Sequence, residues 1–322
     1  MSDATVPGIK RLSDLYRENL STHAIARDPE IVETLLSGIE KESSRRWKVY
    51  HTIRGLISSG LLEDRGQNSS ETVTGYPRKS ERETAVVLGD IHYPYEDPAA
   101  VSVARQILQI LQPDLTVFNG DVLDFYQLSR FEKNPKRHLQ LQEDLDRARV
   151  GMREFREAVP DTEMVLHEGN HEDRLKKFKW KHPELSNLNC LKIEELLDLE
   201  SIGCKVSGLF EPLCWHGWTI THGNLHRRKA GYTAHAMIER YGTSGISNHV
   251  HRLAVVERTN LAQQATWIEN ACLCDLRPHY DIFADWQQGL TVLSWDGHRV
   301  WWEMVPIFNG MAHFRGQPVV AD

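Results

Sequence analysis

Five short clusters of polar side chains constrain the possible folds of this chain more than any other feature of its sequence. Each cluster combines Asp, Asn or His, and four of them follow directly after a short run of apolar and β-branched residues, at 84–88, 115–118, 164–167 and 218–221. Runs of this length and composition predict buried strands. The clusters are Asp90-Ile91-His92, Gly120-Asp121-Val122-Leu123-Asp124, Gly169-Asn170-His171-Glu172, Thr221-His222-Gly223 and Asn248-His249-Val250-His251.

Helical stretches separate these predicted strands. Between the second and third strands, apolar residues recur at steps of three and four, which predicts a helix with one face buried against a sheet; they are Leu141, Leu145, Ala148, Met152 and Phe155. Alternating strands and helices indicate a layered α/β domain. Near the end, residues 290–295 and 299–304 flank Asp296-Gly297, which favours a β-hairpin. We expect the tail from Pro306 to be irregular.

The first 80 residues have a different pattern. Apolar positions at helical spacing within 31–39 and 49–57 predict two helices, the second running from Ser43 or Ser44 to Gly60. Residues 67–80 are polar, contain Gly and Pro, and predict a linker or a small β-wing. We therefore expect a helical module at 1–80 and an α/β domain with a C-terminal β-hairpin region at 81–322.

The N-terminal module has two interpretations. Residues 41–54 contain five basic residues and one acidic residue, and together with residues 56–64 they resemble the recognition helix of a winged helix-turn-helix. A helical packing or dimerisation module fits the same pattern equally well. The sequence thus leaves open both DNA binding and a homodimer.

Composition excludes several classes of protein. With 40% hydrophobic and 26% charged residues, the 322-residue chain has the composition of a folded globular protein. It has no run of about 18 apolar residues and no apolar segment near its start, so we expect a cytoplasmic protein without a membrane partner. Its five cysteines form no C-x-x-C pair, so we expect reduced thiols, with Cys272 and Cys274 serving as packing residues.

The charge distribution limits how the chain could bind nucleic acid. Net charge is −7, and residues 1–80 contain 12 Lys and Arg against 11 Asp and Glu, so the acidic excess lies in the α/β region. Any contact with a polyanion must therefore come from a local basic patch.

The five clusters have the composition of a metal site. Asp90 and His92 are two residues apart, as are His249 and His251, so in an extended segment each pair points to one side and can chelate an ion. Imidazole, carboxylate and amide donors without a thiolate favour Mn²⁺, Fe or Zn²⁺, with Ni²⁺ also compatible, over a structural zinc site. The carboxyl ends of strands are also where open α/β sheets bind ligands.

In this order and spacing, the clusters resemble the calcineurin-like metallophosphoesterases, which include Ser/Thr phosphatases, purple acid phosphatases and Mre11-type nucleases. The resemblance covers about residues 84–255 and implies a four-layer α/β/β/α sandwich that holds two divalent metal ions, with Mn²⁺ expected first. It implies one metal held by Asp90, His92, Asp121 and His251, and a second held by Asp121, Asn170, His222 and His249.

The resemblance also implies a mechanism. Metal-bound hydroxide would attack phosphorus in line, while protonated His171, oriented by Asp124, would assist the leaving group. Two departures from the family pattern matter. Phe125 and Tyr126 follow Asp124 where the Ser/Thr phosphatases have Arg-Gly, which disfavours a phosphoprotein phosphatase, and Asn248 stands in a usual glycine position, where it would tighten the loop.

Two basic runs, at residues 174–181 and at residues 226–229 after His222, suggest a substrate. Residues 174–181 combine cations with Phe178 and Trp180, as in surfaces that bind phosphates and stack bases, although a solvated helix face fits as well. The candidate substrate contacts are Arg174, Lys177, Arg227 and Arg228. We expect a nuclease that cleaves DNA or RNA. A phosphomonoesterase or small-nucleotide phosphodiesterase is the enzymatic alternative, and a nucleic-acid-binding adaptor with a structural metal centre is the non-enzymatic one.

Overall fold

The computed structural model describes residues 8–17, 25, 27–37, 45, 48–49, 52–53, 56, 82–134, 140–259, 264–277 and 284–322. The chain divides into two compact units, residues 1–76 and 77–322. None of the helices in the described ranges has the length and apolar composition needed to cross a membrane.

The N-terminal unit has a small core of its own. Helices α1 (Ile9–Arg17) and α3 (Pro29–Thr34) are joined by Asp28, which caps α3 by accepting from the backbone N–H of Ile31 and pairs with Arg11 at 2.8 Å. Most of the helix predicted at 43–60, and the whole predicted linker or wing at 67–80, lie outside the described residues. The winged-helix interpretation therefore stays a prediction. Buried apolar residues of this core include Leu12, Leu15, Ile31, Leu36, Val49 and Ile53.

A six-stranded sheet forms one half of the second unit. Its strand order is β11-β10-β1-β2-β3-β4; the four strands from β1 to β4 are parallel, and β10 and β11 are antiparallel additions. The strands are β1 (Glu83–Leu88), β2 (Leu115–Asn119), β3 (Glu163–His167), β4 (Cys204–Ser207), β10 (Gln288–Trp295) and β11 (Val300–Ile307).

A five-stranded sheet packs against it. Its order is β5-β6-β7-β9-β8, with β6, β7 and β9 parallel. The strands are β5 (Leu213–Trp215), β6 (Trp218–Thr221), β7 (Gly245–Ser247), β8 (Ala254–Thr259) and β9 (Gln264–Glu269). Side chains from both sheets form the core between them, among them Ala85, Val117, Ile220, Ile246 and Leu293.

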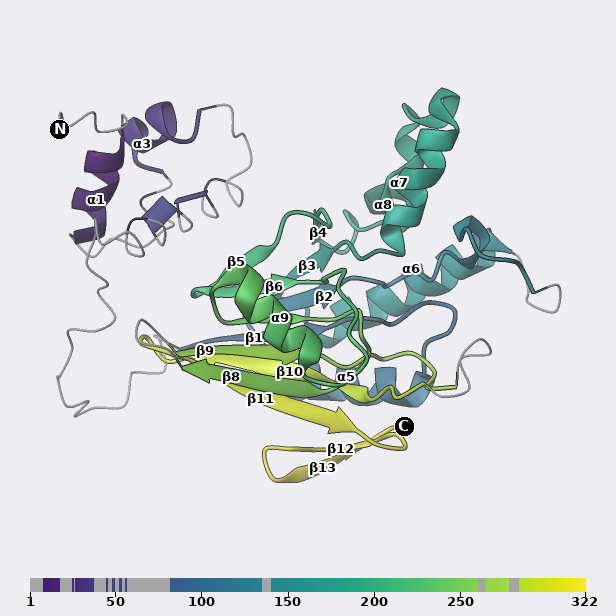
Figure 1. Ribbon diagram of the computed structural model, residues 1–322. Helices are drawn as coiled ribbons and strands as arrows, with labels where there is room; N and C mark the ends of the chain where they lie inside the picture. Colours follow the sequence, from purple (N-terminus) through teal and green to yellow (C-terminus); the bar gives the residue numbers. More distant parts are fainter. Residues whose placement is uncertain are drawn as a thin grey trace. The chain divides into compact units, whose positions relative to one another are not determined.

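Helices cover the outer faces of the two sheets (Figure 1). Helices α5 (Pro98–Leu111) and α6 (Leu141–Ala158) pack on the six-stranded sheet, and α9 (Tyr232–Tyr241) packs on the five-stranded sheet. This arrangement is the predicted four-layer α/β/β/α sandwich. The remaining helical segments are η3 (Tyr126–Leu128), α7 (Glu172–Lys181), η4 (Pro183–Leu185), η5 (Asn189–Leu191) and α8 (Ile193–Leu196), of which α7 projects away from the sheets.

The C-terminal region contains two hairpins. Strands β10 and β11 form the predicted one, and Asp296 Oδ1 closes its turn by accepting from the backbone N–H of Arg299. The prediction of an irregular tail is wrong, because β12 (Met311–Phe314) and β13 (Gln317–Val320) form a second hairpin. It buries Phe314 and Val319 in the core that includes α5. Strands of four residues, one of them containing a proline, leave too short a pattern to be recognised in the sequence.

Candidate metal centre

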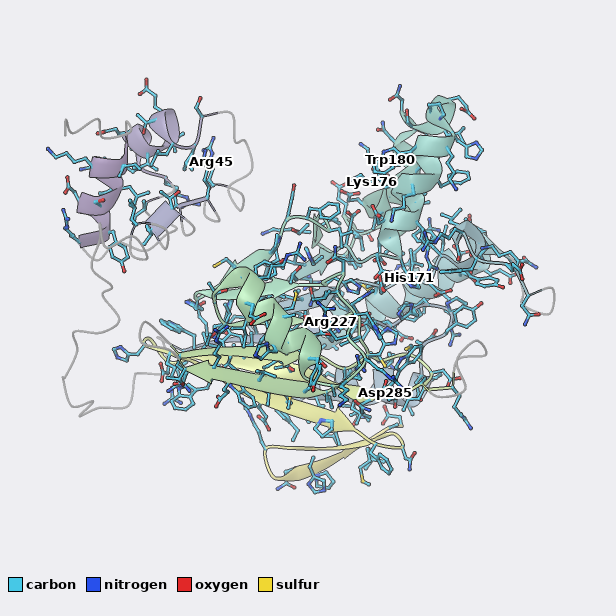
Figure 2. All side chains as sticks on the ribbon, in the orientation of Figure 1. Arg45, His171, Lys176, Trp180, Arg227 and Asp285 are labelled. Carbon is cyan, nitrogen blue, oxygen red and sulfur yellow. The ribbon has the colours of Figure 1, made fainter. Side chains whose placement is uncertain are left out.

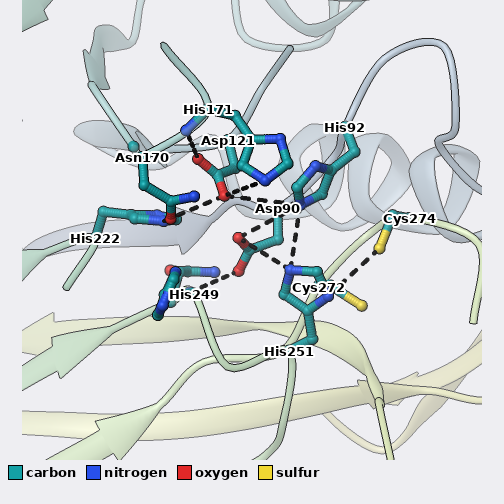
Figure 3. Close-up of polar contacts among 12 residues, drawn as sticks. Asp90, His92, Asp121, Asn170, His171, His222, His249, His251, Cys272 and Cys274 are labelled. Carbon is teal, nitrogen blue, oxygen red and sulfur yellow. Dashed lines mark hydrogen bonds and ion pairs between the residues drawn. The ribbon is translucent and has the colours of Figure 1, made fainter. Parts of the chain in front are cut away.

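All seven side chains predicted as metal ligands lie close together where strands of both sheets end (Figure 3). The segments after β1, β2 and β3 contribute from the first sheet, and those after β6 and β7 contribute from the second. Parallel strands present their carboxyl ends at one edge, so clusters far apart in sequence converge there. The residues are Asp90, His92, Asp121, Asn170, His222, His249 and His251.

Four of these side chains surround one point. His92 Nε2 and His251 Nε2 face each other at 3.1 Å, and Asp90 Oδ1 lies 3.4 Å from His251 Nε2 and 3.8 Å from His92 Nε2. Asp121 Oδ2 lies 3.8 Å from His92 Nε2. Ligand atoms bound to one ion at about 2.0–2.2 Å are separated by about 3–4 Å. The four donors therefore have the spacing of a coordination shell.

A second group of donors adjoins the first through Asp121. Asp121 Oδ2 is 3.3 Å from His222 Nε2, and Asn170 Oδ1 is 3.0 Å from the same nitrogen. Asp121, His222 and His249 each offer a donor atom within 4.8 Å of the others. Asp121 thus borders both groups, as the predicted bridging position requires.

The hydrogen-bonding state of these atoms fits divalent cations. His222 Nδ1 donates to the carbonyl of Asn119 at 2.8 Å, which leaves His222 Nε2 facing the oxygens of Asp121 and Asn170. Burial opposes a charge on this ring, but the carboxylates of Asp121 and Asp90 outweigh it and raise the pKa of His222 to about 10. Asp90 Oδ1 is buried and has no hydrogen-bond partner among the described residues. A positive ion is the partner that these oxygens and nitrogens share.

The outward-facing nitrogens of the rings have partners of their own. His92 Nδ1 lies 3.4 Å from Asp124 Oδ1, and His251 Nδ1 lies 3.8 Å from Cys274 Sγ. Contacts of this kind fix ring orientation and leave Nε2 free to face a metal. Cys274 is buried, as expected of a packing residue, and its contact with His251 adds a role that the sequence did not indicate. The cysteine comes from a segment 23 residues further along the chain, and no local pattern indicated it.

The backbone at the centre is held in an unusual conformation. Five of the seven candidate ligands have positive φ, from 49° to 77°, a region that non-glycine residues rarely adopt. They are Asp90, His92, Asp121, His249 and His251. Glycines allow the close packing around them, since a Cβ on Gly120 would lie 2.3 Å from His222 Nδ1 and one on Gly169 would lie 2.1 Å from Asp121 Oδ1.

Buried Glu172 aligns two of the loops. Its carboxylate accepts from the backbone N–H groups of Asp121, Leu123 and Gly169 at 2.8–3.0 Å. The Glu172 side chain is 1% exposed, so solvent and substrate do not reach it, and its hydrogen bonds hold the backbone of the two loops. The sequence motif contained Glu172, but its spacing gave no indication of this anchoring role.

Asn248 ties the two sheets together behind the centre. Its Oδ1 accepts from Asn119 Nδ2 at 2.9 Å and from Asn270 Nδ2 at 3.3 Å, and its Nδ2 donates to the carbonyl of Ala271. These bonds hold the segment that begins at His249. These hydrogen bonds are how the Asn248 side chain restrains the loop, which the sequence led us to expect.

His171 and Asp124 lie beside the metal-ligand cluster as a pair. His171 Nδ1 is 3.1 Å from Asp124 Oδ1, and His171 Nε2 is 3.7 Å from Asp121 Oδ2. Burial opposes protonation, but the carboxylates of Asp121 and Asp124 outweigh it and raise the pKa of His171. Burial also opposes ionisation of Asp124, but hydrogen bonds from His171 and His92 hold its pKa well below the usual range.

Of the four predicted substrate contacts, the structure brings Arg174 to the site. Its guanidinium lies 2.9 Å from His171 Nε2 and donates to the carbonyl of Asp124 at 2.7 Å. Lys177 instead pairs with Asp173 at 2.6 Å, and its side chain is 59% exposed. Within the described residues, no hydrogen bond or ion pair joins Lys177 to the metal-ligand cluster.

Arg227 and Arg228 are exposed, and their backbone carbonyl groups are bound by a buried side chain; Figure 2 labels Arg227. Buried Arg252 donates to both of their carbonyl groups and pairs with Asp285 at 3.1 Å. Arg252 directly follows His251, so it links the segment that carries His251 to the basic loop after His222. Sequence reasoning missed it because an arginine in a polar segment normally indicates solvent exposure.

Comparison with known proteins places this geometry in a family. The model of the calcineurin-like phosphoesterases matches residues 84–298, and the chain belongs to that family. It is therefore a metal-dependent phosphoester hydrolase, as the sequence clusters predicted. The chain is 30% identical over 244 residues to the Gene 54 protein of Mycobacterium phage D29, and 29% identical over 245 residues to that of Mycobacterium phage L5. Each match covers 70% of this chain and 94% of the relative.

Solved structures give more distant similarities. Vps29 from Entamoeba histolytica, complexed with zinc, matches 71% of this chain and 95% of its own at 12% identity, with a TM-score of 0.39. A dimetal phosphatase from Danio rerio matches 74% of this chain and 99% of its own at 11% identity, also with a TM-score of 0.39.

Proposed function

We propose that this chain is a phosphodiesterase that cleaves nucleic acid with the help of two divalent ions, Mn²⁺ in the first instance. When bound, such a pair of ions activates water for attack on phosphorus and stabilises the attacking and leaving oxygens. The preference for Mn²⁺ follows from the nitrogen and oxygen donors of the seven side chains. One ion would be held by Asp90, His92, Asp121 and His251, and the other by Asp121, Asn170, His222 and His249.

His171 and Arg174 provide the groups next to the scissile bond. The guanidinium of Arg174 lies 2.9 Å from His171 Nε2, and the raised pKa of His171 keeps this ring protonated. A phosphate oxygen is a strong acceptor for a guanidinium, so bound substrate would draw Arg174 to itself. His171 Nε2 then carries a proton toward the leaving oxygen, while Asp124 holds its ring in place.

The single guanidinium at His171 is the observation that favours a diester. A phosphodiester group carries one negative charge, whereas a monoester carries nearly two at neutral pH. The Ser/Thr phosphatases have an arginine directly after the aspartate, but here Phe125 is 2% exposed and Tyr126 is 9% exposed at that place. Arg174, supplied by α7, is the cation that contacts His171.

A side-by-side assay tests the proposal. The full chain is supplied with Mn²⁺ and given bis-p-nitrophenyl phosphate, p-nitrophenyl phosphate, single- and double-stranded DNA, and RNA, with Asp121→Ala as the blank. We expect cleavage of the diester and of nucleic acid that disappears in the variant. Turnover of the monoester alone would make the chain a phosphomonoesterase. Bound metal without any turnover would instead support an adaptor with a structural metal centre.

A further inference from the structure

Two exposed aromatic rings flank one ammonium group beside α7. Trp180 on α7 is 68% exposed, and Phe210, in the segment between β4 and β5, is 73% exposed. Lys176 Nζ lies 5.6 Å from the centre of the Trp180 ring and 5.8 Å from that of Phe210. We refer to these three residues as the aromatic platform. Phe178, predicted from sequence as a stacking residue, instead packs on His182 with ring centres 4.5 Å apart.

The charge on α7 around this platform is positive. The helix has two acidic residues, Glu172 and Asp173, which are 1% and 8% exposed. Its charged groups at the surface are therefore all cations, in a chain whose net charge is −7. This local reversal of charge favours a polyanionic partner. The cations are Arg174, Lys176, Lys177, Lys179 and Lys181.

We propose that the aromatic platform binds bases of a single-stranded nucleic acid whose phosphate backbone enters the metal centre. The inference rests on the proposed function and adds to it the strandedness of the substrate. Every base has a flat face that stacks on an aromatic ring, and a nearby cation contributes to such contacts. In a duplex those faces are already stacked on one another, so the platform selects single strands.

Helix geometry sets how far the strand must reach. Trp180 follows His171 by nine residues on α7 and lies further from the sheets along the same helix (Figure 2). At 1.5 Å per residue, this separation is roughly 14 Å. It corresponds to about four nucleotides at the 3.4 Å spacing of stacked bases, and to fewer in an extended strand. A strand that occupies the metal centre and the platform together must therefore span several nucleotides.

Binding affinity tests the platform directly. The probe is a labelled phosphorothioate DNA 12-mer, single-stranded and slow to be cleaved, titrated with the Mn²⁺-loaded full chain and followed by fluorescence anisotropy. We expect Trp180→Ala and Phe210→Ala each to weaken binding by about 5- to 100-fold, and Trp180→Phe to retain most of it. Trp301→Ala is the matched control. Trp301 lies on strand β11 and is 55% exposed, and the guanidinium of Arg299 lies 5.0 Å from the centre of its ring. This substitution should leave affinity unchanged.

Three further probes separate base stacking from simple charge attraction. An abasic strand of equal length should bind weakly and show no response to Trp180→Ala, because it offers phosphates without bases. The corresponding duplex should behave in the same way, while RNA of the same sequence should respond as DNA does. Lys176→Met should reduce the slope of log affinity against log salt concentration by about one, because one cation that contacts phosphate is removed. Equal binding of the abasic and normal strands would overturn the proposal, and so would an unchanged affinity of Trp180→Ala.

A small substrate distinguishes failure of the platform from failure of the proposed function. Bis-p-nitrophenyl phosphate is too short to reach Trp180, so its rate of hydrolysis should be the same in Trp180→Ala and in the unaltered chain. If the unaltered chain cleaves neither this diester nor nucleic acid but base-dependent binding is lost in the variant, the platform stands and the nuclease proposal fails. If cleavage occurs and binding ignores Trp180, the nuclease proposal stands and the platform is wrong.

Discussion

Arg174 is the residue whose role depends most on the fold. It belongs to a run of cations, and composition alone cannot show which of them lies at the site. In the structure, its guanidinium contacts both His171 Nε2 and the carbonyl of Asp124. Lys177, one helical turn away, pairs with Asp173. The fold therefore gives two neighbouring cations of α7 different roles. Arg174 lies beside His171, where the phosphate is expected to bind, and Lys177 does not.

Replacing Arg174 should damage catalysis while leaving the fold intact. We expect Arg174→Ala to lower kcat/KM for bis-p-nitrophenyl phosphate by about 10- to 1,000-fold, because charge stabilisation of the transition state is lost. Steady-state kinetics of the purified variant measure this effect. Lys177→Ala is the control and should stay within about twofold of the unaltered chain. Equal rates for the two variants would remove Arg174 from the site.

His167 links protonation to stability. It is 0% exposed, and neither ring nitrogen has a hydrogen-bond partner among the described residues. Burial, with a smaller effect of His222, lowers the pKa of His167 to about 3. The unfolded ring has a pKa near 6.5, so below that pH the unfolded state takes up a proton that the folded state does not. The stability contributed by the neutral ring is present above pH 6.5 and is lost as pH falls toward 3.

The variant His167→Leu tests this assignment. Urea unfolding of the unaltered chain should lose about 2 kcal/mol between pH 6.5 and pH 5 through this group, and the variant should lack that part of the decrease. Tryptophan fluorescence is the suitable signal, because eight of the nine tryptophans follow residue 76. Identical pH dependence in the two proteins would show that His167 is not the group responsible.

At the level of elements, the second C-terminal hairpin contributes to stability far from the chemistry. Strands β12 and β13 pack Phe314 and Val319 into the core that α5 shares with the six-stranded sheet. The candidate metal ligands belong to other segments, after β1, β2, β3, β6 and β7. The hairpin should therefore affect the free energy of unfolding and not the reaction.

Truncating one side chain of this hairpin tests that separation. Phe314→Ala should lower the free energy of unfolding by about 3–5 kcal/mol, as expected for a large aromatic residue removed from a core. Urea unfolding measures it, and kcat on bis-p-nitrophenyl phosphate should be unchanged below the transition. Phe308→Ala, which alters a ring that is 75% exposed, should change stability little. A loss of kcat without a loss of stability would contradict this division of roles.

Strands that end in a polar cluster could be predicted from the sequence, and other elements could not. The runs at 84–88 and 218–221 match β1 and β6 to within one residue, because burial and the polar cluster after the strand both mark them. Strand β5 has three residues and β12 has four, too few for a period to appear.

The candidate ligands could be predicted for the same reason, since each occurs in a local motif. Arg252, Cys274 and Phe210 could not be, because each acts through a partner distant in the chain. Arg252 bonds to the carbonyl groups of residues 227 and 228, Cys274 contacts His251, and Phe210 contacts Lys176. Local patterns contain no information on such tertiary contacts.

On the scale of the whole molecule, the two units have separate cores. All candidate ligands, His171 and Arg174 belong to residues 77–322, while residues 1–76 form a core of their own. Residues 77–322 expressed alone should therefore hydrolyse bis-p-nitrophenyl phosphate within about threefold of the full-chain rate, because no group of the reaction is removed. Steady-state kinetics on both proteins, with Asp121→Ala in each as the blank, make the comparison. A folded but inactive fragment, with its fold checked by circular dichroism, would show that the N-terminal unit takes part in catalysis.

We expect this chain to bind two divalent ions, one at each of the two donor groups that Asp121 borders. Metal content per chain, determined by plasma mass spectrometry after loading with Mn²⁺ and gel filtration, tests it most directly. We expect two ions per chain in the unaltered protein and in Lys177→Ala, and at most one in Asp121→Ala, with loss of diester hydrolysis. An active protein that holds a single ion, or an Asp121→Ala variant that retains two ions and full activity, would contradict it.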